Sequence, residues 1–169
     1  MKLTLWRSVR RAHAATAFTG EGAARFPGRY NAAGVRAVYL ADCPSGCALE
    51  IMARYAAPEA IRTQMLFEVA VDAPLVDLRS AQMQKRYGFT WETDAAADDY
   101  EASRRVAARL LAEKRAGAVV PSATVARAFN VVVYPDNWNR FVVRGPEPLA
   151  LDRRLVRLVR SAGVRDGRG

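Results

Sequence analysis

Histidine and cysteine are scarce in this chain. Histidine occurs only as His13, and the two cysteines are Cys43 and Cys47. The i, i+4 spacing of the cysteines suits one helix face, but a structural zinc site takes about four ligands and His13 lies far away in the sequence. The composition therefore argues against a resident metal. Two ordinary thiols, partly buried in a reducing compartment, are expected instead.

Long hydrophobic runs are also missing. No apolar stretch approaches the ~20 residues that a membrane helix needs. The first fifteen residues, MKLTLWRSVRRAHAA, contain no apolar stretch long enough for a signal peptide. These absences predict a cytoplasmic protein. A chain of 169 residues is long enough for one domain with a buried core.

Lysine is rare, although the chain is strongly basic. The formal net charge is +9, yet lysine occurs only at Lys2, Lys85 and Lys114. Arginine supplies the other positive charges, and its planar guanidinium binds phosphate and carboxylate groups through paired hydrogen bonds. A positive field attracts nucleic acid, phosphorylated small molecules or an acidic partner protein. A genomic preference for arginine codons explains the excess equally well, but it does not explain individual arginines placed in turns.

Hydrophobic periodicity divides the chain into strands and helices that do not alternate regularly. Helices are expected at 44–56, with Asp42 as N-cap, and at 99–116, with Gly117 as the stop signal. Strands are expected at 3–9, 36–41, 65–72, 75–78 and 118–123, and a β-hairpin over 129–145 with its turn at Pro135-Asp136-Asn137. No repeat or linker is visible. The pattern predicts one α+β domain over residues 1–160 and a frayed Arg- and Gly-rich tail over 161–169.

Glu50 is the first candidate for chemistry. It lies in CALEIMA (47–53), which is apolar nearly all the way round and is expected to be buried. A carboxylate in such a helix needs a partner or a function. Arg54, four residues on, offers an ordinary helical ion pair. The other interpretation is a carboxylate that faces a substrate cleft.

Two further segments carry polar or cationic residues at turns. Ser122 ends the strand in VVPSA, where it suits the N-cap of a short helix better than a nucleophile, because no G-x-S-x-G element is present. The segment GEGAAR (20–25) lacks the third glycine of a dinucleotide-binding turn. A glycine-rich loop followed by Arg25 and Arg29 still suits a pyrophosphate, with Tyr30 or Tyr39 beside an aromatic ring. The alternative is a solvated loop.

Two long segments together resemble the RES-domain family. GEGAARFPGRYNAAGVRAVYLADCPSGCALEIM (20–52) holds a G-x-G-A turn, a G-R-Y-N element, a V-Y-L strand and a helix with a glutamate, and VVPSATVARAFNVVVYPDNW (119–138) resembles the second half of the pattern. The Arg, Glu and Ser that name the family match Arg29, Glu50 and Ser122. The resemblance covers roughly residues 5–155. It departs from the pattern at Pro27-Gly28, which replaces Gly-Gly, and in lacking a histidine of the second half.

The resemblance implies a fold and an activity. RES proteins are toxins of bacterial toxin–antitoxin pairs, with a split β-sheet similar to that of ADP-ribosyltransferase toxins. The implied substrate is NAD, without a metal, and the implied reaction is cleavage of the nicotinamide–ribose bond. An NAD phosphorylase or glycohydrolase would deplete NAD, and the alternative is a mono-ADP-ribosyltransferase that modifies a protein. The implied site consists of Glu50, Arg29 and Ser122 as catalytic residues and of Arg7, Arg29, Tyr39, Ser122 and Asn130 as NAD-binding residues.

The resemblance also implies a partner, an Xre-like helix-turn-helix antitoxin, and phosphate as a possible co-substrate. Two other classes of function stay open. A nucleic-acid-binding module would interleave basic residues with exposed aromatics, whereas the aromatics here lie mostly in apolar strands. A non-catalytic interaction protein would show no NAD turnover and would tolerate Glu50→Gln. Neither membrane association nor direct nucleic-acid binding is expected.

Overall fold

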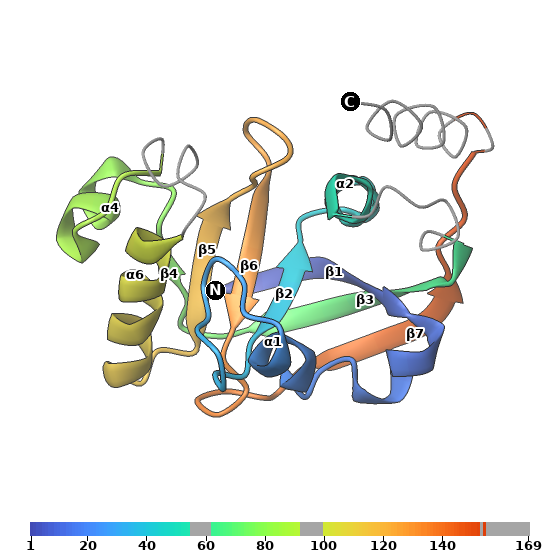
Figure 1. Cartoon of the computed structure of the whole chain (residues 1–169), viewed down its shortest axis with the longest axis horizontal. Helices are drawn as coiled ribbons and strands as arrows, with labels where there is room; N and C mark the ends of the chain where they lie inside the picture. The colour runs from blue at the N-terminus through green and yellow to red at the C-terminus, as the bar shows by residue number, and fades with distance from the viewer. Residues whose placement is uncertain (55–61, 92–99, 153, 155–169) are drawn as a thin grey trace, which may run out of the picture.

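A mixed β-sheet forms the centre of the molecule (Figure 1). The computed structural model describes residues 1–54, 62–91, 100–152 and 154. In this part of the chain seven strands follow the order β4-β5-β6-β2-β1-β3-β7, and only β4 and β5 are parallel. The strands are β1 (Lys2–Arg10), β2 (Val38–Ala41), β3 (Gln64–Asp72), β4 (Val76–Asp77), β5 (Gly117–Pro121), β6 (Phe129–Val133) and β7 (Val142–Pro148). The predicted single α+β domain is confirmed.

The sheet consists of two groups of strands that are joined at one place. Within the described residues, β1 pairs with β2 only through Trp6 and Ala41, whereas β1 pairs with β3 along its whole length. Figure 1 shows β5, β6 and β2 running steeply across the direction of β1, β3 and β7. The division expected from the family resemblance therefore takes the form of a narrow junction between β1 and β2.

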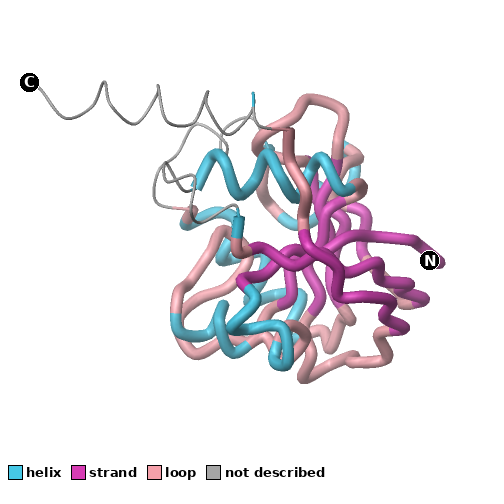
Figure 2. The backbone as a smooth tube through the Cα atoms, turned by 90° about the vertical axis from the view of Figure 1, so that its right-hand side faces the viewer, coloured by secondary structure: helices cyan, strands magenta, loops and turns pink. Residues whose placement is uncertain are grey.

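Helices lie beside the strands rather than between them (Figure 2). The main ones are α2 (Pro44–Arg54), α4 (Ala81–Tyr87) and α6 (Glu101–Ala112), and two short ones follow β1, η1 (Arg11–Thr16) and α1 (Glu21–Arg25). Helix α6 buries Ser103, Val106, Ala107 and Leu110, which share one face at helical spacing. Among the described helices, none has the length and apolar character to cross a membrane.

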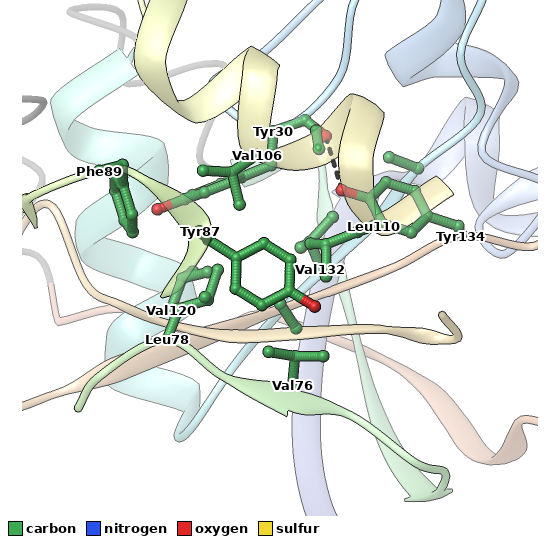
Figure 3. Close-up of a cluster of buried hydrophobic side chains, with 13 residues drawn as sticks. Tyr30, Val76, Leu78, Tyr87, Phe89, Val106, Leu110, Val120, Val132 and Tyr134 are labelled. Carbon is green, nitrogen blue, oxygen red and sulfur yellow. Dashed lines mark hydrogen bonds between the residues drawn. The ribbon is translucent and has the colours of Figure 1, made fainter. Parts of the chain in front are cut away.

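The hydrophobic core covers both faces of β6. Val131, Val132 and Val133 are all fully buried, and consecutive side chains of a strand point to opposite faces. Val132 packs with Tyr30 and Tyr134 in one cluster, where the Tyr134 hydroxyl donates a hydrogen bond of 3.1 Å to the Tyr30 carbonyl (Figure 3). Tyr30 is therefore a core residue, so of the two rings expected beside a ligand, Tyr30 or Tyr39, only Tyr39 is left.

The predicted hairpin over 129–145 is also wrong. The chain does turn after Tyr134, whose carbonyl accepts hydrogen bonds from the amides of Asn137 and Trp138. However, β6 pairs with β2 and β5, while β7 lies at the far edge of the sheet against β3. A turn signal between two strands does not decide their partners, because pairing depends on which apolar faces meet in the fold.

Two predicted helix boundaries need correction. Asp42 is not an N-cap, because its carboxylate accepts from the amide of Phe129, and the amide of Gly46 is bound by the Cys43 sulfur instead. Helix α6 ends before Gly117, which lies in β5 facing the backbone of Val132. The predicted end of the 44–56 helix and the 161–169 tail lie outside the described residues.

Candidate active site

Glu50 lies on α2 at the border between its buried and exposed faces. Its Oε1 accepts a 2.8 Å hydrogen bond from Asn130 Nδ2 and a 3.3 Å bond from Thr124 Oγ1. These two side chains, and not Arg54, are the partners of the carboxylate among the described residues. The helix is not buried all round as expected, because Leu49 is 40% exposed. The carboxylate therefore sits at the surface in a polar setting built by other segments.

Ser122 follows β5 and organises the turn behind it. Its Oγ accepts from the amides of Thr124 and Val125 at 3.2 and 3.3 Å and lies 3.1 Å from Thr124 Oγ1. This is the hydrogen bonding of an N-cap, but the expected helix is absent from residues 122–128, which form bends and a turn. Ser122 reaches Glu50 through the hydroxyl of Thr124.

The loop that carries Arg29 is fixed by Asn31. The Asn31 side chain is fully buried and accepts at Oδ1 from the Gly28 amide at 3.0 Å and from the Tyr39 hydroxyl at 2.7 Å. Its Nδ2 donates to three backbone carbonyls, those of Ala23, Ala32 and Val35. A fully satisfied buried amide of this kind specifies one loop conformation. The GRYN element therefore holds Arg29 in a defined position.

Two aromatic rings flank the Arg29 guanidinium. Its Cζ lies 4.3 Å from the centre of the Tyr100 ring and 5.1 Å from that of Trp91. Arg104 adds to the arrangement, because its Nε donates to the Gly28 carbonyl at 3.3 Å. Cation–π contacts hold a guanidinium without neutralising its charge. These contacts fix where the guanidinium of Arg29 lies.

Arg7 is the second arginine of the site. Its Nη1 donates a 2.7 Å hydrogen bond to the Tyr39 carbonyl, and within the described residues its buried Nε has no hydrogen-bond partner. Burial lowers the pKa of Arg7 to about 10, so the side chain is still charged at neutral pH. A buried cation with an unused donor is suited to an anion.

Tyr39 connects the two arginines. Its carbonyl binds Arg7, and its hydroxyl accepts from the Tyr30 amide at 3.0 Å in the loop of Arg29. Burial raises the pKa of Tyr39 to about 12, against the opposing hydrogen bond from Tyr30. Nearby positive charges also oppose the rise, those of Arg54, Arg104 and Arg29. The hydroxyl stays protonated at neutral pH and donates to Asn31.

Sheet register brings Tyr39 and Asn130, one residue from each group, to one face of the sheet. Tyr39 pairs with Val132 and Ala41 with Asn130 across β2 and β6. Because side chains two residues apart share a face, Tyr39 and Asn130 are diagonal neighbours, at a typical spacing of about 7–8 Å. The group of Glu50, Thr124, Ser122 and Asn130 therefore adjoins the group of Tyr39, Arg7 and Arg29.

Four residues of this arrangement were not predicted from the sequence. Asn31 and Thr124 had a local signal, because one follows Arg29-Tyr30 directly and the other lies two residues after Ser122. Trp91 and Tyr100 had none, because they are far from Arg29 in the sequence.

No group of three or more potential metal ligands occurs among the described residues. Burial raises the pKa of the Cys47 thiol to about 12, which makes it unreactive.

Comparison with known proteins decides the family. The model of the RES domain matches residues 4–154. This chain belongs to the RES-domain family. It is also similar to a chain in the crystal structure of the M. tuberculosis MbcT–MbcA toxin–antitoxin complex, with 26% sequence identity, a TM-score of 0.74 and coverage of 95% of this chain and 90% of that chain. No curated protein matches the sequence.

The residues that correspond to the name of the RES family lie in both groups of the site. In one group, Glu50 and Ser122 are connected by hydrogen bonds through Thr124. In the other group, Arg29 lies in the loop that is hydrogen-bonded to Tyr39. A surface hollow beside α4 and α6 contains none of the six predicted site residues. It is lined by Arg79, Ala81, Gln84, Lys85, Gly88, Phe89, Thr90, Ala102 and Arg105.

Proposed function

We propose that this RES protein is the toxin of a toxin–antitoxin pair and that it cleaves the nicotinamide–ribose bond of NAD. The family assignment and the similarity to the MbcT–MbcA complex support the toxin role. The site supports an NAD phosphorylase or glycohydrolase, which depletes NAD by transferring ADP-ribose to phosphate or water. The alternative function is that of a transferase that modifies a protein, and the experiment below distinguishes the two.

The setting of Glu50 carries the proposal. Its Oε1 is held by Asn130 and Thr124, whereas its Oε2 accepts no hydrogen bond from the described residues. Departure of nicotinamide leaves positive charge on the ribose, and a fixed carboxylate stabilises that charge or grips the ribose hydroxyls. The glycosidic electron pair leaves with nicotinamide, which becomes neutral, and an oxygen of phosphate or water forms the new bond to the ribose carbon. When water is the acceptor, it releases one proton to the solvent. No proton has to be delivered to the leaving group.

The arginines suit the other end of NAD. Its pyrophosphate carries two negative charges, and a guanidinium binds such oxygens through charge-assisted hydrogen bonds. Arg7 offers a phosphate oxygen its buried Nε, which has no partner among the described residues, and the Arg29 guanidinium lies against Tyr100 and Trp91 in the loop that is hydrogen-bonded to Tyr39. In this proposal Tyr39, which adjoins both arginines, is the residue nearest to the nicotinamide.

A partner is part of the proposal. An enzyme that destroys NAD has to be inhibited, and we propose that an Xre-like helix-turn-helix antitoxin does so by entering the site. The net charge of +9 favours an acidic inhibiting segment.

The experiment is an incubation of the purified protein with NAD, with and without phosphate, followed by identification of the products. ADP-ribose 1″-phosphate indicates a phosphorylase and ADP-ribose a glycohydrolase, whereas label on a protein would favour the transferase. Glu50→Gln should reduce turnover by roughly 10²–10³-fold. The control Glu147→Gln makes the same change on the exposed strand β7 and should leave turnover unchanged. Wild-type turnover by a folded Glu50→Gln variant would refute the assignment.

A further inference from the structure

Thr124 lies between two residues of the site and has no role assigned so far. From this position we infer that Thr124 is a positioning residue, and that Ser122 acts on the reaction through Thr124 rather than by touching the substrate. The inference rests on the proposed function for its catalytic part. Its structural part, a hydroxyl relay from Ser122 through Thr124 to the Glu50 carboxylate, stands on the hydrogen bonds alone.

Counting protons gives the relay its direction. A hydroxyl has one hydrogen to donate. Thr124 Oγ1 donates its hydrogen to Glu50 Oε1, because an ionised carboxylate only accepts. The 3.1 Å contact between the hydroxyls of Ser122 and Thr124 then requires Ser122 to be the donor. The order of donation is Ser122 to Thr124 to Glu50.

The hydroxyl of Ser122 is then fully occupied. It donates to Thr124 and accepts from the amides of Thr124 and Val125. A hydroxyl oxygen has two lone pairs, and both are in use. Direct donation from Ser122 to the ribose or nicotinamide would require the relay to be broken first. The arrangement therefore favours a serine that polarises Thr124 over a serine that contacts substrate.

The loop between β5 and β6 holds the relay against α2. The Ser122 amide donates to the Ala128 carbonyl at 3.0 Å, which closes the loop at its base. Figure 1 shows this loop rising beside α2, and the bond from Thr124 to Glu50 joins the two segments. Asn130, on β6, donates to the same Oε1. The carboxylate is therefore fixed by one donor from this loop and one from β6, with Oε2 left for the substrate.

Kinetics of four proteins test the catalytic part. Thr124→Val keeps the shape but removes the hydroxyl, and loss of a hydrogen bond to a charged group should lower kcat by about 10- to 100-fold. The KM for NAD should change by less than about threefold, because the substrate contacts stay. Thr124→Ser should recover most of the lost kcat. In the double variant Ser122→Ala/Thr124→Val, kcat should equal that of Thr124→Val alone. Effects that multiply would show that Ser122 acts on its own and would overturn the inference.

A spectroscopic measurement tests the relay without turnover. Asn130 Nδ2 donates to the same Oε1, so its side-chain amide signals in ¹⁵N-labelled protein report where the carboxylate lies. Thr124→Val and Ser122→Ala should both shift these signals, whereas Thr124→Ser should leave them close to wild type. Unchanged signals in a folded Thr124→Val protein would refute the relay. If the wild type fails to consume NAD but the signals shift as expected, the proposed function fails and the relay stands.

Discussion

The guanidinium carbon of Arg29 lies 4.3 Å from the centre of the Tyr100 ring. The backbone of Tyr100 is in the left-handed region, with φ 56°. Left-handed conformations of non-glycine residues cost of order 1–3 kcal/mol and persist where the surroundings fix them. Tyr100 also precedes the first residue of α6, so its ring is placed by the start of that helix. The position of Arg29 thus depends on a residue 71 positions away in the sequence.

Removing the Tyr100 ring should weaken NAD binding. A cation–π contact contributes about 0.5–2 kcal/mol, which corresponds to a 2- to 30-fold change in affinity. Tyr100→Ala should therefore raise the KM for NAD within this range, with a smaller effect on kcat. Tyr100→Phe keeps the ring face and serves as the control. A KM that rises equally in both variants would show that the hydroxyl, and not the ring, is responsible.

Replacing Asn31 should cost both stability and activity. Asn31→Ala leaves the Gly28 amide and the Tyr39 hydroxyl without their acceptor and three carbonyls without their donor. The expected loss in the free energy of unfolding is about 3 kcal/mol. Asn139→Ala, the same substitution at an exposed site, should have an effect below about 0.5 kcal/mol. Urea unfolding of both variants measures the difference, and equal stabilities would refute the role of Asn31.

Much of this site could be predicted from the sequence, and the missing parts share a physical reason. Strands such as β1 and β3 were predicted because alternation is a local signal, and Glu50 was singled out because a carboxylate among apolar helix residues is unusual. Whether Glu50 pairs with Arg54 or with Asn130 is not a local question. The answer depends on the position of β6, eighty residues away, relative to α2. Local spacing favoured the wrong partner.

The hairpin prediction failed for a related reason. A turn at Pro135-Asp136-Asn137 between two β-rich segments looks like a hairpin, and the turn itself is present. However, both edges of β6 are already paired, one with β2 and the other with β5, so β7 pairs with β3 instead. Trp91 and Tyr100 escaped prediction in the same way, since their contact with Arg29 arises from packing and leaves no trace in spacing.

Gly117 should not tolerate a side chain. A Cβ at this position would lie 2.0 Å from the carbonyl oxygen of Val132, a backbone atom of the neighbouring strand. Gly117→Ala must push β5 and β6 apart and should lower the free energy of unfolding by about 3 kcal/mol or more. Gly22→Ala is the matched control, because its Cβ meets nothing within 4 Å and alanine favours the helix α1. A thermal melt in which both variants resemble the wild type would contradict the prediction.

The charge around Tyr39 leads to a prediction about the inhibiting partner. Arg29, Arg54 and Arg104 all lie close enough to this phenol to act on its pKa, so the approach to the site is positive. An acidic segment of the proposed antitoxin should bind there and reduce NAD turnover. Attraction between exposed charges is screened by salt and acts mainly on the rate of association. Raising the salt concentration should therefore slow association more than it speeds dissociation.

A matched pair of arginine variants distinguishes attraction by the charges around Tyr39 from attraction by the net charge of the protein. Arg54→Ala removes a charge beside Tyr39, whereas Arg140→Ala removes an exposed one beyond the far end of β6. Stopped-flow binding should show slower association for Arg54→Ala than for Arg140→Ala, because both lose one unit of net charge but only the first lies at the site. Equal association rates for the two variants would show that the attraction depends on net charge alone. A partner that binds tightly while NAD turnover continues would refute inhibition by entry into the site.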